Sequence, residues 1–452
     1  MTWEAADARV MTREQAQALI ERTIKMSKAD AIQVNIGGGY NANIRFADNR
    51  ISTAGGVATA QVNVQSSFGP KHAVVSTNDF TDAGLERAVR QSEALAKLAP
   101  DDPEAMPPLP PQQYDQVKTY FDVTGSLSPE ARAEAARQAI EPCKSAGDLK
   151  AAGFLITGIG AGAVGNSKGL FAYQSGTSSN YTLTVRTTDG TGSGWAGADH
   201  PDWSKVDVKD VARRAIEKAR LSRNPVAIEP GRYTVILEPQ AVGDLVQLLA
   251  FALDARSADE GRSAFSKQGG GTKIGEKIVD ERVSLFSDPK DPELLSNTFD
   301  GQGLPARRQV WIEKGILKKL TYSRFWAQKK NVEPDAGTNA VKFAGGTQTR
   351  EQLIASTPRG ILVTRLWYLR QVDPRTVLYT GLTRDGTFLI ENGKITKSVK
   401  NLRFNESPLF MLNNLEALGA ASRVAGTEGG GDVVMPVIKV KDFNFTSLSD
   451  AV

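Results

Sequence analysis

The chain has 452 residues, and 55 Lys and Arg against 51 Asp and Glu give it a formal net charge of only +4 at pH 7. A charge this small does not by itself indicate nucleic-acid binding. The 40% hydrophobic and 23% charged content is typical of a globular protein, and the length favours about two or three domains. One cysteine excludes an internal disulfide, and two histidines leave few side chains of the kind that bind zinc.

The beginning of the sequence predicts no targeting segment. Residues 1–20 alternate charged and small side chains without an apolar core, so we expect neither a secretory signal nor a transit peptide. No membrane span is evident in the sequence. Together with a single cysteine, which suits a reducing compartment, these features predict a cytoplasmic protein.

The first hundred residues predict two helices around an antiparallel sheet. Residues 12–15 form a capping box that opens a helix ending near Lys28, and a second helix is predicted over 82–98. Between them, four segments alternate apolar and polar residues around glycine and asparagine turns, which indicates strands at 31–36, 43–47, 59–67 and 73–76.

A proline-rich stretch follows. Six prolines between residues 100 and 111 forbid a helix and predict an extended connector over 100–125. Beyond it, Ser128 and Pro129 start a helix running to about Ala139, strands dominate 153–188, and a helix follows over about 206–221. We therefore predict an N-terminal α+β region of residues 1–226, in which the connector joins subdomains 1–99 and 126–226.

The chain changes character from residue 227. A strand at 234–237 precedes a strongly apolar helix that begins after Glu238, and strand-and-turn sequence dominates thereafter. We expect that helix to bury one set of side chains: Val242, Leu245, Val246, Leu249 and Leu253. The prediction is a β-rich, barrel- or sandwich-like C-terminal domain over 227–452, and hence an α+β fold class.

Two glycine motifs match enzymatic patterns that we interpret as structural. Residues 160–165 match a dinucleotide fingerprint, but strand sequence follows where a helix is required, so we expect a turn between strands. Residues 165–169 match a nucleophile elbow around Ser167, which also needs a helix and a histidine base. His72 and His200 are far apart in sequence, and we interpret both as surface histidines and Cys143 as a half-buried thiol.

The best case for nucleic acid is the stretch 307–330, where eight Lys and Arg side chains surround four aromatic ones. Residues 311–317 also fit two short strands around a Lys-Gly turn, with the lysines on the solvated face. We favour this structural hairpin.

Four phrases in the second half occur in a recognisable order: residues 261–266, 299–308, 312–317 and 383–393. By these phrases, the chain resembles the TldD/PmbA (TldE) family over about residues 230 to 445. The catalytic member of that family, TldD, has a helix beginning His-Glu-Ala-Val-Gly-His. Its histidines bind zinc, its glutamate is the general base, and a cysteine in a late glycine-rich segment is a further ligand.

In this chain the corresponding helix reads Pro239-Gln240-Ala241-Val242-Gly243-Asp244. Proline replaces the first histidine, glutamine the base and aspartate the second histidine, while Ala425, in the late segment 424–429, stands where the cysteine is expected. The resemblance therefore implies no metal site, no cofactor and no catalytic residue in this chain. Gln240 can still hydrogen-bond a peptide, but it cannot take a proton at neutral pH.

These replacements make the chain similar to the PmbA/TldE-type member of the family. There, two kinds of subunit form a cytoplasmic heterodimeric peptidase that cleaves unfolded or modified peptides, with zinc in the TldD-type subunit only. We therefore expect a non-catalytic subunit that pairs with a TldD-type chain or with itself and contacts peptide but no membrane. Two alternatives remain: a self-associating peptide-binding module without protease activity, and a nucleic-acid-associated regulator like the family's older description as a DNA gyrase modulator. The charge balance disfavours the latter.

Overall fold

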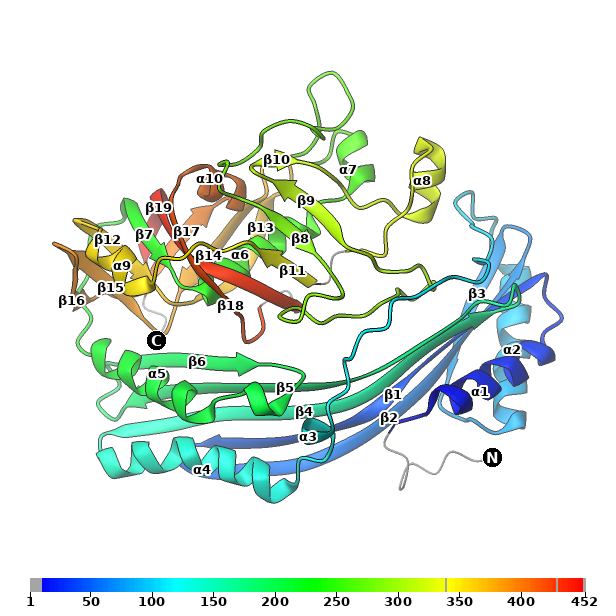
Figure 1. Ribbon diagram of the computed structural model, residues 1–452, viewed down its shortest axis with the longest axis horizontal. Helices are drawn as coiled ribbons and strands as arrows, with labels where there is room; N and C mark the ends of the chain where they lie inside the picture. Colours follow the sequence, from blue (N-terminus) through cyan, green and yellow to red (C-terminus); the bar gives the residue numbers. More distant parts are fainter. Residues whose placement is uncertain (1–9, 338–339, 428–429, 450–452) are drawn as a thin grey trace.

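The computed structural model describes residues 10–337, 340–427 and 430–449. Residues 1–9, part of the segment in which we expect no targeting signal, lie outside the described residues. The chain forms a mixed α+β structure with one sheet in its N-terminal half and a larger sheet in its C-terminal half (Figure 1). The predicted fold class is therefore confirmed.

In the described part of the chain, the N-terminal sheet has six antiparallel strands in the order β3-β2-β1-β4-β5-β6. Four strands are long and two are short: β1 (Ala31–Ala47), β2 (Arg50–Phe68), β4 (Leu149–Asn166) and β5 (Phe171–Thr187), with β3 (Lys71–Thr77) and β6 (Ser193–Asp199) at the two edges. The strands expected at 31–36 and 43–47 are thus one continuous strand.

Two groups of glycines, which we expected to lie in turns, lie inside strands. Residues 37–39 belong to β1, and residues 160–165, which we expected to form a turn, belong to β4. A Cβ atom on Gly39 would lie 2.1 Å from the carbonyl oxygen of Ile159 on the neighbouring strand. Glycine is needed here because two backbones approach closely, and not because the chain turns.

Segments on both sides of the proline-rich connector contribute to this one sheet, because β1 pairs with both β2 and β4. Residues 99–121 form neither helix nor strand between α2 (Asp82–Leu98) and α3 (Asp122–Gly125). The backbone amide of Thr177 in β5 donates to the carbonyl of Thr119 at 2.9 Å. The connector therefore crosses from one end of the sheet to its far edge.

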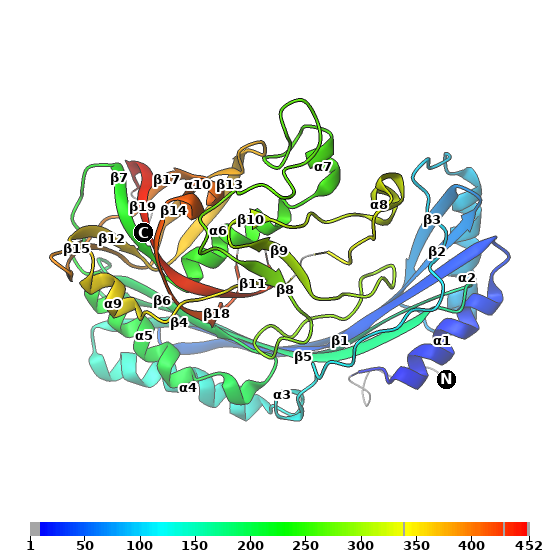
Figure 2. The same cartoon turned by 45° about the horizontal axis from the view of Figure 1, so that its top comes forward.

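The sheet is curved, and its helices lie on the convex face (Figure 2). Helices α1 (Arg13–Met26) and α2 cover one end, while α4 (Pro129–Ala146) and α5 (Val208–Leu221) cover the other. Helix α4 continues past Pro142, farther than predicted. Cys143 on this helix is fully buried rather than half-buried, and burial raises the pKa of its thiol to about 11.

The C-terminal sheet has thirteen strands among the described residues. They are β7 (Gly231–Leu237), β8 (Leu285–Ser287), β9 (Gln309–Glu313), β10 (Ile316–Leu317), β11 (Ala340–Phe343), β12 (Arg359–Val363), β13 (Leu366–Asp373), β14 (Leu378–Thr383), β15 (Thr387–Glu391), β16 (Lys394–Ser398), β17 (Leu402–Glu406), β18 (Leu415–Arg423) and β19 (Asp432–Leu448). Strand β19 pairs with four others and so ties the domain together: β7, β11, β17 and β18.

Helix α6 (Pro239–Phe251) lies within this domain. Four of the five predicted core side chains, Val242, Leu245, Val246 and Leu249, lie on this helix and are fully buried, which confirms the expected buried face. The fifth, Leu253, is 1% exposed but lies two residues beyond the end of the helix. The C-terminal domain also has four short helices among the described residues: α7 (Ala255–Asp259), α8 (Arg324–Lys330), α9 (Arg350–Ala355) and α10 (Pro408–Asn413). Within the described ranges, no helix combines the length and the apolar composition that crossing a bilayer demands.

The basic, aromatic stretch forms the predicted hairpin, with β9 and β10 joined at Lys314 and Gly315. Its Trp311 is completely buried, so that ring is not available for stacking on a base. Lys318 pairs with Glu313 at 3.2 Å, as expected for a solvated hairpin face. The helix that follows at Arg324 was not predicted.

One buried carboxylate in this domain titrates near neutrality. Glu406, at the end of β17, is 2% exposed and accepts hydrogen bonds from the backbone amides of Ser407 at 2.9 Å and Asn444 at 3.1 Å. Burial outweighs these bonds and raises its pKa from 4.5 to about 7. In the folded state the protonated form therefore predominates below about pH 7.

We predict that Glu406→Gln destabilises the protein at pH 4.5 and that this stability difference shrinks at pH 8. The folded pKa of Glu406 exceeds the unfolded one, so its stabilising contribution is complete below pH 4.5 and is lost as the pH rises through 7. Glutamine stays neutral at both pH values, but its amide nitrogen cannot accept the second of the two backbone hydrogen bonds. The variant should therefore lose stability at pH 4.5 and recover roughly 1–3 kcal/mol of that difference in the free energy of unfolding by pH 8. Urea denaturation at both pH values measures this, and a difference that does not change with pH would contradict it.

Candidate functional site

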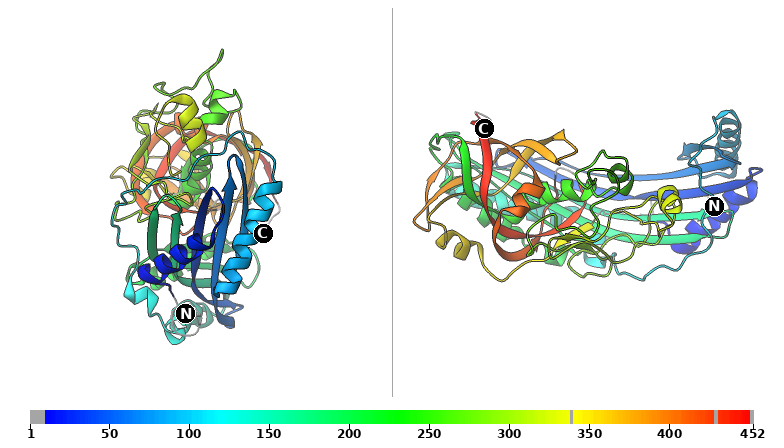
Figure 3. Two further views of the ribbon diagram at one scale, coloured as in Figure 1. Left: turned by 90° about the vertical axis from the view of Figure 1, so that its right-hand side faces the viewer. Right: turned by 90° about the horizontal axis from the view of Figure 1, so that it is seen from above.

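A cleft of about 1340 Å³ lies between the concave face of the N-terminal sheet and the C-terminal domain. The C-terminal domain sits over one end of the long strands, while α1 and α2 lie at the other end (Figure 3). The cleft wall opposite the sheet comes from segments around β8, β9 and β11 and from the two ends of the β18–β19 connection.

Glycines form the floor of this cleft. Alternate residues of β1 point to opposite faces, so Val34 and Ile36 are buried toward the helices while Gly37 and Gly39 face the cleft. Gly37 lies opposite Gly162 of β4, and Gly39 lies opposite Gly160. With no side chains at these positions, the sheet offers a smooth surface that a bound chain could approach closely.

Amide and hydroxyl side chains surround the glycine floor. They include Asn41, Gln61, Asn63 and Ser178. Amides both donate and accept hydrogen bonds, as does a peptide backbone. The arrangement can therefore bind extended peptide through groups common to every sequence.

A loop of the C-terminal domain is fastened to the sheet at one end of the cleft. The carbonyl of Gly301 accepts hydrogen bonds from Asn35 Nδ2 at 2.6 Å and from Gln33 Nε2 at 3.1 Å. Three residues earlier, the backbone amide of Thr298 donates to Gln174 Oε1 at 2.8 Å. Side chains of β1 and β5 thus hold this loop against the floor.

A charged cluster lines the wall near β6. Arg423 pairs with Asp199 at 2.8 Å and also with Asp432. Burial raises the pKa of Asp432, and the positive charge of Arg423 offsets this only in part. Burial and the same arginine lower the pKa of His200, whose Nδ1 accepts a hydrogen bond from the amide of Asp202 at 2.9 Å. His200 is thus neutral at pH 7 and half-buried.

The sequence-predicted reactive residues are not brought together. His72 lies on β3 and His200 follows β6, so the two histidines are at opposite edges of the sheet. Ser167 lies in the turn between β4 and β5, where its Oγ accepts a hydrogen bond from the amide of Ile32 at 3.2 Å. Strand follows that turn, so the expectation that it is not a nucleophile elbow is confirmed.

The four positions where the zinc motif is replaced, here called the altered motif, come together beside the cleft wall. They are Pro239, Gln240, Asp244 and Ala425. Gln240 Nε2, in the first turn of α6, donates to the carbonyl of Gly426 at 2.7 Å. The neighbouring Ala425 is 7% exposed and packs closely on Gly197 of β6. Asp244 lies on the same helix and is 3% exposed. Residues 428 and 429, the end of the late glycine segment, lie outside the described residues.

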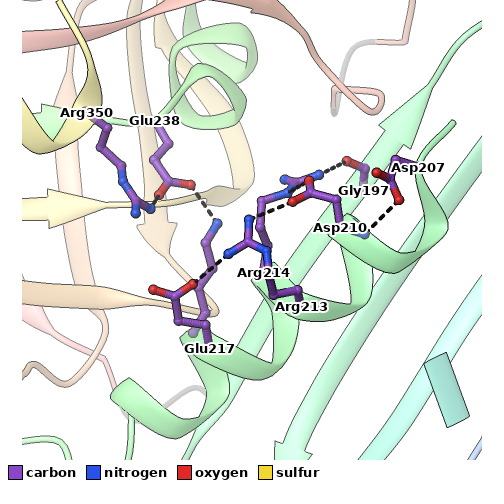
Figure 4. A network of polar contacts seen from close by, with 9 residues as sticks. Gly197, Asp207, Asp210, Arg213, Arg214, Glu217, Glu238 and Arg350 are labelled. Atoms are coloured by element: carbon purple, nitrogen blue, oxygen red, sulfur yellow. Dashed lines mark hydrogen bonds and ion pairs between the residues drawn. The ribbon is translucent and has the colours of Figure 1, made fainter. Parts of the chain in front are cut away.

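An ion-pair network fixes the beginning of α6 (Figure 4). Glu238, immediately before Pro239, pairs with Lys218 of α5 at 2.6 Å and with Arg350 of α9 at 2.8 Å. Burial alone would raise the pKa of Glu238, but the two positive charges outweigh it and hold the pKa below its ordinary value. The carboxylate therefore links the N-terminal region to the C-terminal domain next to the altered motif.

The donor atoms at this place do not suit zinc. The side chains of Pro239 and Ala425 carry no atom that can bind zinc, and the Gln240 amide is engaged with Gly426. Of the four positions, only Asp244 has a side chain that is a strong zinc ligand. Elsewhere in the described ranges, no group of three His, Cys, Asp or Glu side chains is arranged to hold a metal ion.

Comparison with known proteins shows the family and the fold of the chain. Family models of the PmbA/TldA metallopeptidase match the chain over 123–223 for the central domain and over 230–447 for the C-terminal domain. The chain belongs to the TldD/PmbA family. The crystal structure of TldE from Thermococcus kodakarensis superposes with a TM-score of 0.84, covering 96% of this chain and all of that one at 20% identity.

Other similar proteins carry two kinds of description. A structure from Thermotoga maritima, described as a putative modulator of a DNA gyrase, has a TM-score of 0.84 over 95% of this chain and all of its own at 17% identity. A metalloprotease of Methanothermobacter thermautotrophicus is 26% identical over 49% of this chain and 50% of its own length. A TldD homologue of Buchnera aphidicola is 25% identical over 49% of this chain and 45% of its own. The chain spans no more than about half the length of these two curated relatives.

We predict that rebuilding the motif restores little activity. Pro239→His, Gln240→Glu, Asp244→His and Ala425→Cys together supply ligands and a base, but zinc ligands also need partners that fix their orientation. The Gln240 bond to Gly426 would be lost, and the larger side chain at position 425 would crowd Gly197. Elemental analysis should show weak zinc binding, and thermal unfolding should show a lower Tm. Fast chelator-sensitive peptide cleavage by this variant alone would contradict the prediction.

Proposed function

We propose that this chain is a non-catalytic, PmbA/TldE-like subunit of a cytoplasmic zinc metallopeptidase complex, in which a TldD-type subunit carries the metal. Its role is to hold unfolded or modified peptides near the partner's active site. The observation that carries the proposal is the position of the altered motif: the helix that bears the metal in TldD is present here, next to a large cleft, with its donor atoms replaced.

The chemistry of the cleft supports a peptide ligand. Its floor is glycine and its polar side chains are amides and hydroxyls, which suit a peptide backbone in an extended conformation. Arg423 pairs with both Asp199 and Asp432, so its positive charge is engaged within the protein and does not select an acidic sequence. Binding by shared backbone groups fits a subunit that accepts many unfolded chains.

The gyrase-modulator alternative has weaker support. Trp311, the first aromatic ring of the basic stretch, is buried, and Lys319 and Lys330 pair with Asp335 and Asp259. These contacts take up side chains that nucleic acid would need.

We predict that activity appears only on mixing. The chain alone should not cleave casein, whereas addition of a TldD-type relative with an intact His-Glu-Xaa-Xaa-Xaa-His helix should give cleavage that a chelator abolishes. Casein fragments are followed on gels, with the relative alone as the control. Cleavage by the isolated chain that survives the chelator would contradict the proposal. It would instead favour Ser167 as a catalytic nucleophile.

We also predict that filling the cleft floor abolishes peptide binding. A Cβ at Gly37 meets no atom within 4 Å, so Gly37→Phe places a ring in the cleft without displacing the backbone. Fluorescence anisotropy of a labelled casein peptide should show at least about tenfold weaker binding, a loss of about 1.4 kcal/mol. Gly37→Ala is the matched control and should bind nearly normally. Equal binding by the two variants would place the peptide elsewhere.

A further inference from the structure

Five charged side chains line the cleft, and four of them are engaged within the protein. Arg423 pairs with Asp199 and Asp432. The carboxylate of Asp300 accepts hydrogen bonds from two backbone amides of its own loop, both at 2.9 Å. The fifth is Arg307, an exposed residue that lies just before β9.

Arg307 is free to bind a ligand. Within the described ranges, its side chain makes no hydrogen bond, ion pair or ring contact. Its neighbour Arg308 pairs with Asp288 at 3.6 Å, lies over the ring of Phe286, and is not among the residues that line the cleft. Of two adjacent arginines, one is thus used by the fold, while the other presents its charge to the cleft.

The backbone on both sides of Arg307 is held in place. Before it, the amide of Ala306 donates to the carbonyl of Thr298 at 2.8 Å, and the amide of Thr298 donates to Gln174 of β5. After it, Gln309 begins β9 and pairs with β8. The arginine is therefore fixed between the sheet and the C-terminal domain, which lowers the entropic cost of binding a ligand there.

An amide side chain lies opposite the arginine. Phe299 and Pro305 form an antiparallel bridge. In the same register, Asn297 lies opposite Arg307. Asn297 is exposed and lines the cleft, and its side chain has no hydrogen-bonding partner among the described residues. Its amide can donate a hydrogen bond beside the guanidinium, so the wall offers two unused donor groups at one place.

A guanidinium is a strong ligand for a carboxylate. Arginine binds a carboxylate through two parallel hydrogen bonds, and such charge-assisted bonds are stronger than those between neutral groups. A peptide on the glycine floor can carry a carboxylate in two ways: at its C-terminus, or on an Asp or Glu side chain. The first is common to all unmodified peptides, so a carboxylate site is compatible with a cleft that accepts many sequences.

We propose that Arg307 and Asn297 form an anion-binding subsite of the cleft, which takes a carboxylate group of the bound peptide. The guanidinium binds the carboxylate, and the amide donates a further hydrogen bond. The floor holds a peptide through groups that repeat along its backbone, whereas the subsite fixes one point of the peptide and so sets its register in the cleft. This inference rests on the proposed function, because it requires that the cleft bind peptides.

Four labelled peptides of one sequence test the proposal by fluorescence anisotropy on the purified full chain. They carry either Glu or Gln at one internal position, either a free or an amidated C-terminus, and no other acidic residue. We expect at least one carboxylate-bearing peptide to bind at least about fivefold tighter than the peptide with neither group. Dependence on the free C-terminus identifies the main-chain carboxylate as the ligand, and dependence on Glu identifies the side chain.

Variants of the wall test which residue is responsible. Arg307→Gln should reduce the difference between the peptides to less than about twofold, because glutamine keeps a donor but no charge. Asn297→Asp should also remove it, since the new carboxylate occupies the guanidinium. Arg308→Gln is the matched control: it removes the adjacent arginine, which does not line the cleft, and should keep the full difference. Because Arg307 is exposed, thermal unfolding should give the same Tm for Arg307→Gln and the unaltered chain.

Equal binding of all four peptides by the unaltered chain would overturn the subsite and leave the proposed function standing, because the cleft would still bind peptide. A preference for carboxylate that persists in Arg307→Gln, or that Arg308→Gln also removes, would place the anion elsewhere and likewise overturn the subsite. Failure to bind any of the four peptides would contradict the proposed function and the subsite with it.

Discussion

The contact between the two halves at the altered motif depends on one buried carboxylate. Glu238 lies between Lys218 of the N-terminal region and Arg350 of the C-terminal domain, at the residue where α6 begins. A buried carboxylate is costly unless opposite charges and hydrogen bonds compensate it, so the three side chains must stay together. The same contact fixes where the first turn of α6 meets the segment around Gly426, and hence the wall of the cleft.

The cleft and the altered motif differ in the chemical groups that they carry. Groups that could bind a peptide backbone are abundant on the concave sheet, while the four motif positions retain one carboxylate, Asp244, which is too few ligands to hold a metal that activates water. The replacements are also compatible with a stable helix. The proline does not disrupt it, because Pro239 occupies the first helical position, where its missing N–H costs nothing.

Local patterns in the sequence predicted what local interactions determine. Helix α2 has the predicted bounds, and the helix after Glu238 buries four of the five predicted side chains, while the fifth is buried just beyond its end. The glycines of β1 and β4 misled the prediction because their role depends on a partner strand more than a hundred residues away. For the same reason no pattern revealed the cleft, which joins Gly37 to Asp432. The motif positions were found only through the family resemblance.

The burial of Cys143 has a consequence for how the protein can be observed. The thiol lies between α4 and the sheet, with a pKa of about 11, and the thiolate is the form that reacts with alkylating reagents. In the folded chain it is therefore protected both by packing and by protonation. Its rate of alkylation reports how often α4 detaches from the sheet, so the chain carries a native probe for local opening of this end of its structure.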